Sequence, residues 1–190
     1  MANADLEDLL TSSGAILRGH FLLTSGRHSD VYVEKFRILE QPDVLSRLCS
    51  NIADRFRSEH IELVAGPTTG GIIIAFEVAR QLGVPAVYVE SEDGVRKLRR
   101  GGTVRAGSRV LIVDDVLTTG TSLLEVEAVI QNAGGVLAGV AVLIDRSQTP
   151  LPLECPFYAA HRVEAISYHP DEIPEWLAKI PITKPGTRVR

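Results

Sequence analysis

The sequence predicts an α/β fold in which a mostly parallel, twisted sheet is flanked by helices. Short apolar runs alternate with helical segments from residue 62 to residue 144, a rhythm typical of parallel strands joined by crossover helices. Glycines stop the helices at Gly83 and at the Gly134–Gly135 pair. The composition is that of an ordinary globular domain, with 45% hydrophobic and 23% charged residues.

The first sixty residues precede this alternation. Residues 3–13 read as a short helix that ends near Gly14. The stretch GHFLLTSGRHSDVYVEKF, residues 19–36, reads as two strands joined by a turn at Ser25–Gly26. Pro42 opens an amphipathic helix whose apolar residues recur at helical spacing, namely Leu45, Leu48, Ile52 and Phe56.

Four apolar runs follow that are short enough to be buried strands. They occupy residues 62–66, 85–90, 109–113 and 136–144. Helices are expected over residues 72–82 and about 121–132. No helical pattern joins the second of these strands to the third, so the rhythm is interrupted between residues 91 and 108.

We expect one domain over residues 1–190. Within it, residues 41–150 form the core, and residues 1–40 and 151–190 contribute a small N-terminal and C-terminal hood. The last forty residues hold six of the 10 prolines and one short helix candidate, PEWLAKI, so they read as an appendage.

Charge and composition argue against several classes of protein. A net charge of -4 disfavours non-specific nucleic-acid binding, and no apolar run reaches the length of a membrane span. The acidic start MANADLEDLL does not resemble a signal peptide. The 2 cysteines, Cys49 and Cys155, lack metal-ligand spacing and suggest reduced thiols, so we expect a cytoplasmic protein.

The stretch RVLIVDDVLTTGTS, residues 109–122, is the strongest candidate for a binding site. Two carboxylates, Asp114 and Asp115, follow the buried run, where ligands of open parallel sheets bind. They would accept hydrogen bonds from a sugar diol or approach Mg²⁺. The residues that follow precede a helix N-terminus, which favours phosphate; they are Val116, Leu117, Thr118, Thr119, Gly120, Thr121 and Ser122. The alternative is a helix cap followed by turn residues.

A second small-residue loop and a basic segment extend this chemistry to a second anion. GPTTGG, with Thr68, Thr69 and Gly70, lies between a strand and a helix and predicts another anion loop; a tight turn alone is the alternative. The helix-less junction carries five cations flanked by glycines, which suggests a mobile segment that binds phosphate, or else a solvated basic loop. They are Arg96, Lys97, Arg99, Arg100 and Arg105.

These motifs resemble those of type I phosphoribosyltransferases. VLIVDDVLTTGTS is similar to the signature that binds phosphoribosyl diphosphate in that family. Four further stretches resemble orotate phosphoribosyltransferases, in the same order: GHFLLTSGRHSDVYVEK, GPTTGGIIIAFEVARQLG, GVRKLRRGGTV and IDRS. The resemblance implies the type I phosphoribosyltransferase fold and transfer of the phosphoribosyl group of phosphoribosyl diphosphate to orotate, which gives orotidine 5′-monophosphate and pyrophosphate.

The resemblance also implies roles for individual residues. Asp114 and Asp115 would be catalytic, would bind the ribose hydroxyls and would lie near a Mg²⁺ cofactor. Val116 and Leu117 would also contact phosphoribosyl diphosphate, residues 118–122 would hold its 5-phosphate, and residues 68–70 its pyrophosphate. The basic segment, above all Arg99 and Arg100, would close over the leaving group, usually in the neighbouring subunit of a homodimer. Orotate would meet four residues, namely Thr118, Arg146, Tyr32 and Val33.

The sequence leaves two other functions open. One is a regulator that binds phosphoribosyl diphosphate without catalysis, although no helix-turn-helix or basic face accompanies the site. The other is a transferase for a different base, which the hood and Arg146 disfavour.

Thr24 and Gly70 stand where well-studied members of the family carry lysines.

Overall fold

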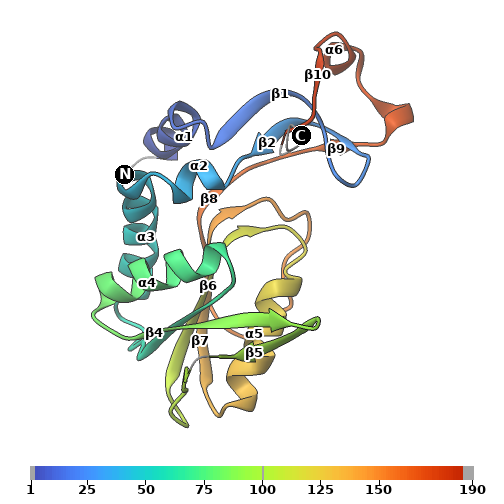
Figure 1. Cartoon of the computed structure of the whole chain (residues 1–190). Coiled ribbons are helices and arrows are strands. Elements are labelled where there is room, and N and C mark those ends of the chain that lie inside the picture. The colour runs from blue at the N-terminus through green and yellow to red at the C-terminus, as the bar shows by residue number, and fades with distance from the viewer. Residues whose placement is uncertain (1–2, 100, 186–190) are drawn as a thin grey trace. The chain divides into compact units, whose positions relative to one another are not determined.

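The structure, a computed structural model, describes residues 3–99 and 101–185 (Figure 1). The chain divides into two compact units. The first combines Met1–Glu40 with Val163–Arg190, and the second is Gln41–Arg162. The expected core began at residue 41 and ended at residue 150, so the observed core unit extends twelve residues further at its C-terminal side.

The core unit is built on a six-stranded sheet in the order β5-β4-β3-β6-β7-β8. All neighbouring strands run parallel except β5, which is antiparallel to β4. The predicted α/β architecture is therefore confirmed. The strands are β3 (Leu63–Pro67), β4 (Ala86–Glu92), β5 (Val95–Leu98), β6 (Arg109–Leu117), β7 (Val136–Asp145) and β8 (Phe157–Arg162).

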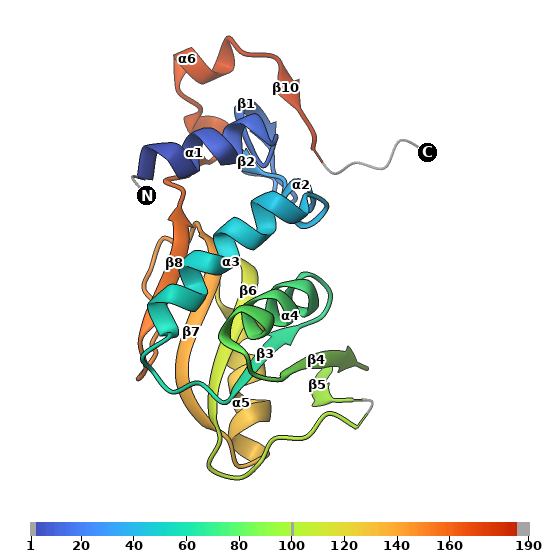
Figure 2. The same ribbon diagram turned by 90° about the vertical axis from the view of Figure 1, so that its left-hand side faces the viewer.

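Helices cover both faces of this sheet. α3 (Pro42–Phe56) and α4 (Gly70–Leu82) pack on one face, and α5 (Thr121–Asn132) packs on the other (Figure 2). The buried side chains of α5 are Leu123, Val126 and Ile130, which join one cluster with residues of β3, β6 and β7. On the α3 side, Gly139 of β7 leaves room for the ring of Phe56, which a Cβ at that position would displace.

Three features of the core differ from the expectation. β6 continues four residues beyond Val113, to Leu117, because the carboxylate-bearing stretch stays paired with β7. The junction without a helix forms a β4–β5 hairpin, which turns at Asp93 and Gly94, both with positive φ. β8 pairs with β7 and belongs to the core, although the proline-rich sequence around it suggested an appendage.

The other unit contains a four-stranded sheet in the order β10-β1-β2-β9. The predicted strand–turn–strand is confirmed, and Gly26 of its turn has a φ of 79°. The C-terminal segment supplies both edge strands of this sheet. The elements of the unit are α1 (Asn3–Ser12), β1 (Ile16–Leu22), β2 (His28–Val33), α2 (Phe36–Leu39), β9 (Ser167–Tyr168), the 3-10 helix η1 (Pro170–Glu172), α6 (Glu175–Ala178) and β10 (Ile182–Thr183).

A buried histidine pair joins the N-terminal strands to the C-terminal segment. Nε2 of His20 lies 2.6 Å from Nδ1 of His28, and Nδ1 of His20 lies 3.1 Å from the carbonyl oxygen of Ile180. A carbonyl only accepts, so neutral His20 donates from Nδ1 and accepts at Nε2 from His28. Burial, together with the neighbouring His20, lowers the pKa of His28.

Among residues 3–99 and 101–185, no helix is both long enough and apolar enough to cross a membrane.

Candidate active site at the carboxyl ends of the core sheet

The core sheet has a topological switch point between β3 and β6. The chain leaves β3 through α4 and returns on one side, at β4; it leaves β6 through α5 and returns on the other side, at β7. The two helices consequently start beside each other, on opposite faces of the sheet. Ligands of open α/β sheets bind in the crevice that such a divergence creates at the carboxyl ends of the strands. Both loops singled out from the sequence lie there.

Asp114 and Asp115 lie inside β6, near its carboxyl end, rather than after the strand. Successive side chains of a strand project to opposite faces, so the two carboxylates diverge instead of forming a side-by-side pair. Asp115 is only 7% exposed, whereas Asp114 is half-buried. The N–H of Asp115 donates to Oδ1 of Asp114 at 2.8 Å, and that of Val116 donates to Oδ1 of Asp115 at 2.7 Å. These bonds orient both carboxylates before a ligand arrives.

The loop after β6 forms the expected start of a helix. Thr118, Thr119 and Thr121 are exposed, and the Oγ1 atoms of Thr119 and Thr121 lie 3.1 Å apart. Gly120 has a φ of 81°, and a Cβ there would overlap the side chain of Leu151. Glycine is therefore required both by the backbone and by the neighbouring loop. The first N–H groups of α5 have no partner inside the helix, which makes this loop suited to an anion.

The loop between β3 and α4 is closed by two glycines. A Cβ on Gly71 would lie 2.6 Å from Cδ of Pro67, and a Cβ on Gly66 would overlap the carbonyl oxygen of Gly71. The chain can thus reverse from strand to helix within a few residues. Thr68 is tied to the neighbouring strand, because its N–H donates to the carbonyl of Val89 at 3.1 Å. The Thr68–Thr69 peptide bond is cis.

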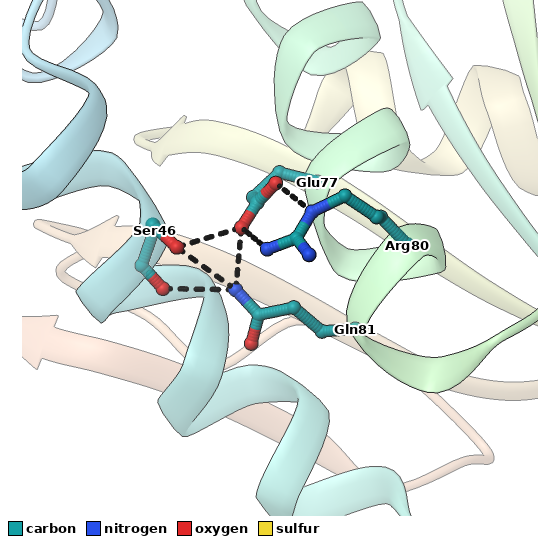
Figure 3. Close-up of polar contacts among 4 residues, drawn as sticks. All are labelled: Ser46, Glu77, Arg80 and Gln81. Atoms are coloured by element: carbon teal, nitrogen blue, oxygen red, sulfur yellow. Dashed lines mark hydrogen bonds and ion pairs between the residues drawn. The ribbon is translucent and has the colours of Figure 1, made fainter.

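α4, which begins at this loop, is fixed to α3 by a carboxylate network (Figure 3). Oε1 of Glu77 accepts from Oγ of Ser46 at 2.7 Å, from Nε2 of Gln81 at 2.6 Å and from Arg80 at 2.8 Å. Nε of Arg80 also donates to Oε2 at 2.8 Å. The Arg80 hydrogen bonds, opposed in part by burial, lower the pKa of Glu77 to about 2. The network orients the helix that starts at residues 68–70.

Part of the basic segment forms strand β5. Arg96 and Lys97 lie in β5, where Nε of Arg96 is 3.0 Å from Glu125 of α5. Glu92 pairs with two further cations: Nζ of Lys97 lies 3.4 Å and an amino group of Arg99 lies 2.8 Å from its Oε2. Arg105 pairs with Glu62. The expected open loop is thus partly a strand whose cations face carboxylates of the same chain. Arg100 lies outside the described residues.

Arg146 follows β7, beside the end of β6. Its N–H donates to the carbonyl of Leu117 at 3.0 Å, so the loop after β7 is attached to the start of the Thr118–Ser122 loop. The preceding residue, Asp145, is 4% exposed and was missed by the sequence reasoning. Its Oδ1 accepts from both the N–H and the Oγ of Ser147, at 2.8 and 2.6 Å. The only indication of Asp145 in the sequence was that an acidic residue directly precedes Arg146.

Tyr32 and Val33 belong to β2 in the other unit. The ring of Tyr32 lies 5.7 Å from that of Phe21, centroid to centroid, and Val33 pairs with Ile16 of β1. Within the core unit, the structure places the two anion loops, the two acids and Arg146 along one edge of the sheet.

Each acid at this end of the sheet could give an oxygen ligand to a Mg²⁺ ion that shares its other ligands with a substrate. Asp114 and Asp115 are oxygen donors, but the described part of the chain contains no group of three or more residues able to hold a metal. Mg²⁺ commonly takes one or two carboxylates and completes its shell with substrate phosphates and water. The donor set therefore suits an ion that arrives with a phosphorylated ligand.

Two of the hollows in the described part of the chain lie at the ends of the core strands. One, of about 580 Å³, is at the amino ends, where Glu62, Pro85 and Ser108 precede their strands. Its position at the amino ends argues against the main ligand site. The smaller, of about 170 Å³, lies behind the ends of β6 and β7 and includes Leu117 and Asp145 in its lining.

Comparison with known proteins identifies the family. The phosphoribosyl transferase domain model matches residues 37–172. The chain is 43% identical over 188 residues to the orotate phosphoribosyltransferase of Pelotomaculum thermopropionicum, covering 99% of both chains. It is 41% identical over 181 residues to that of Chlorobium phaeobacteroides, covering 95% of this chain and 94% of the relative.

Solved structures agree. The crystal structure of orotate phosphoribosyltransferase from Aeropyrum pernix matches with a TM-score of 0.73 and 30% identity, over 84% of this chain and 94% of that one. An adenine phosphoribosyltransferase from Thermoanaerobacter pseudethanolicus, at 18% identity and a TM-score of 0.61 over 70% of this chain and 88% of that one, shares the fold. The switch-point loops, the strand-borne acids and these full-length similarities together place the chain in the phosphoribosyltransferase family, among the orotate phosphoribosyltransferases.

Proposed function

We propose that this chain transfers the phosphoribosyl group of 5-phosphoribosyl 1-diphosphate to orotate, giving orotidine 5′-monophosphate and pyrophosphate, a step of pyrimidine nucleotide synthesis. One observation carries the proposal: two anion loops and two acids meet at the switch point of a chain 43% identical, over 99% of its length, to an orotate phosphoribosyltransferase. In this transfer the bond between C1 and the pyrophosphate oxygen breaks, and its electron pair leaves with pyrophosphate. A ring nitrogen of orotate loses its proton and forms the new bond to C1.

The two loops divide the phosphates of the substrate between them. Residues 118–122, at the start of α5, hold the 5-phosphate through backbone N–H groups and threonine hydroxyls. Thr68, Thr69 and Gly70, at the start of α4, hold the pyrophosphate. The sugar between them is thereby fixed with its C1 directed away from the 5-phosphate loop, which reduces the entropy cost of reaching the transition state.

Asp114 and Asp115 serve the sugar. The half-buried Asp114 is the more accessible of the two and accepts hydrogen bonds from the ribose hydroxyls. The buried Asp115 adds a second negative charge near the ring. Positive charge develops at C1 as the pyrophosphate leaves, so two preoriented carboxylates stabilise the transition state more than the ground state. Mg²⁺, held by these acids and the substrate, would neutralise phosphate charge.

The cations of the β4–β5 hairpin serve the leaving group. Lys97 and Arg99 keep 51% and 43% of their side chains exposed, so both can exchange their Glu92 partner for a phosphate oxygen. Arg96 and Arg100 complete the set that we assign to pyrophosphate. Arginine binds phosphate oxygens in a bidentate manner, and closure of the hairpin would exclude water from the reacting centre.

Orotate is recognised at the other side of the sugar. Arg146, at the end of β7, is positioned to meet the carboxylate of the base, and Thr118 lies one strand away at the end of β6. We assign the edge of the base to the backbone of Tyr32 and Val33 in β2.

We also propose that the chain works as a cytoplasmic homodimer. Ile73 and Phe76 are exposed by 42% and 65%, and their spacing places both on one face of α4. An apolar face of this kind suits a second copy of the chain. Phe76→Glu is expected to convert a dimer into monomers in analytical ultracentrifugation. Phe36 is also exposed but lies outside α4, so Phe36→Glu serves as the control and should leave the dimer intact. A monomeric parent protein would contradict the assignment.

The test of the reaction is spectroscopic. Orotate absorbance is expected to fall when phosphoribosyl diphosphate and Mg²⁺ are added to the protein, and to recover when pyrophosphate is added in excess. Binding of phosphoribosyl diphosphate without turnover of any base would indicate a regulator instead. Turnover of adenine or hypoxanthine but not of orotate would indicate a transferase for purines.

A further inference from the structure

We infer that Asp145 is a positioning residue that fixes Arg146 for the recognition of orotate. The inference rests on the proposed function, and it adds a residue that lies beside the ligand-binding groups without contacting the ligand itself.

The loop after β7 is tied down on both sides of Arg146. Before it, Asp145 is paired with Leu117 of β6 in the sheet register. After it, Ser147 is held by Oδ1 of Asp145 through two hydrogen bonds, one to its N–H at 2.8 Å and one to its Oγ at 2.6 Å. The N–H of Arg146 itself donates to the carbonyl of Leu117 at 3.0 Å. Three consecutive residues therefore have fixed backbones.

The carboxylate of Asp145 is buried, and both of its oxygens have partners within the chain. It is 4% exposed, its Oδ1 serves Ser147, and its Oδ2 lies 3.9 Å from Nε of Arg162 in β8. The Arg162 side chain is 67% exposed, so this ion pair is weak and solvent-screened. The two hydrogen bonds with Ser147 are thus the main interactions of the Asp145 side chain.

The consequence concerns geometry. A guanidinium binds a carboxylate well only when its planar donors are correctly aimed, and small displacements of a binding group cost large factors in rate. Releasing Ser147 would let the backbone at Arg146 rotate while the β6 and α5 groups that hold phosphoribosyl diphosphate stay in place. Loss of Asp145 should accordingly affect orotate and spare the other substrate.

Kinetics of a small variant set test the inference. Asp145→Ala is expected to lower kcat/KM for orotate by about 10- to 100-fold, through a higher KM for orotate, while the KM for phosphoribosyl diphosphate changes less than about twofold. Asp145→Asn keeps the oxygen acceptor and should restore most of the activity. Ser147→Ala, which loses one of the two hydrogen bonds, should fall between them. Arg162→Met should resemble the parent protein.

A double-mutant cycle with Arg146→Ala shows whether Asp145 acts through Arg146. If it does, adding Asp145→Ala to Arg146→Ala has no further effect on the KM for orotate. An equal penalty in both backgrounds, or an equal rise in the KM of both substrates, would overturn the inference. Should Asp145→Ala fail to fold, Ser147→Ala in the same cycle decides by the same criterion.

The cycle also separates this inference from the function beneath it. If Arg146→Ala leaves the KM for orotate unchanged while turnover persists, the orotate role of Arg146 fails, and the positioning role of Asp145 fails with it. If Arg146→Ala raises that KM and Asp145→Ala does not, only the positioning role is overturned. Absence of orotate turnover in the parent protein would instead reject the proposed function.

Discussion

Replacing Glu77 by glutamine should destabilise the core unit, and should do so only where the carboxylate is ionised. Lowering the pKa of a carboxylate from 4.5 to about 2 corresponds to ~3 kcal/mol of stabilisation at neutral pH. The Glu77 side chain is 14% exposed but that of Arg80 is 58% exposed, so water screens part of the interaction. We therefore expect Glu77→Gln to cost about 2 kcal/mol at pH 7.

The pH dependence follows from the direction of the pKa change. A carboxylate whose pKa is lower in the folded state contributes its full stabilisation above the unfolded pKa of 4.5, and loses it as the pH falls toward 2. Urea unfolding of the parent protein and of Glu77→Gln at pH 7, 4.5 and 3 measures this. The difference between the two should shrink steadily as the solution becomes more acidic.

A matched control lies on the neighbouring helix. Asp54 pairs with Arg57 at 3.1 Å, but its side chain is 65% exposed, so Asp54→Asn should change the free energy of unfolding by less than about 0.5 kcal/mol. The reasoning would be refuted if Glu77→Gln cost no more than Asp54→Asn at pH 7. It would also be refuted if the cost of Glu77→Gln were the same at pH 7 and pH 3.

Three further variants probe the site. Asp114→Asn combined with Asp115→Asn should lower turnover at least ~100-fold with little change in thermal unfolding, because asparagine keeps the Oδ1 acceptors for the N–H groups of Asp115 and Val116; loss of folding would instead favour a purely structural role. Arg99→Ala should lower kcat more than it raises the KM for orotate, and unchanged steady-state kinetics would exclude a role in catalysis. Gly71→Ala should cost at least ~2 kcal/mol in urea unfolding, because its Cβ would lie 2.6 Å from Cδ of Pro67; a variant as stable as the parent would show that the turn can relax.

The parts of the fold that depend on periodicity could be predicted from the sequence. The runs around Leu63, Val110 and Val140 are apolar because both faces of a parallel sheet are covered, and each was expected as a strand. α5 begins at Thr121, as expected from the small residues before it, whereas α4 begins at Gly70, two residues before the expected start. The two small-residue loops were placed correctly at the ends of β3 and β6.

Elements with little apolar content were harder to predict. β5 reads VRKL, and its strand conformation depends on the hairpin turn at Asp93–Gly94 and on carboxylates from β4 and α5. β8 follows Pro156 and gains its place only by pairing with β7. The divergence of Asp114 and Asp115 was missed because it depends on β6 continuing past Val113, which pairing with β7 decides and local sequence does not.

The β4–β5 hairpin carries its own counter-ions. Glu92 pairs with Lys97 and Arg99, and Glu125 of α5 pairs with Arg96, so two of these three positive charges are already offset before any ligand is present. An anion that binds these cations therefore has to replace a carboxylate of the same chain as their partner. Chloride or a monovalent phosphate ester competes poorly in such an exchange, whereas a pyrophosphate group brings several charges at once. Under the proposed function, Glu92 of the hairpin and Glu125 of α5 thus favour polyanions over singly charged ions as ligands of these cations.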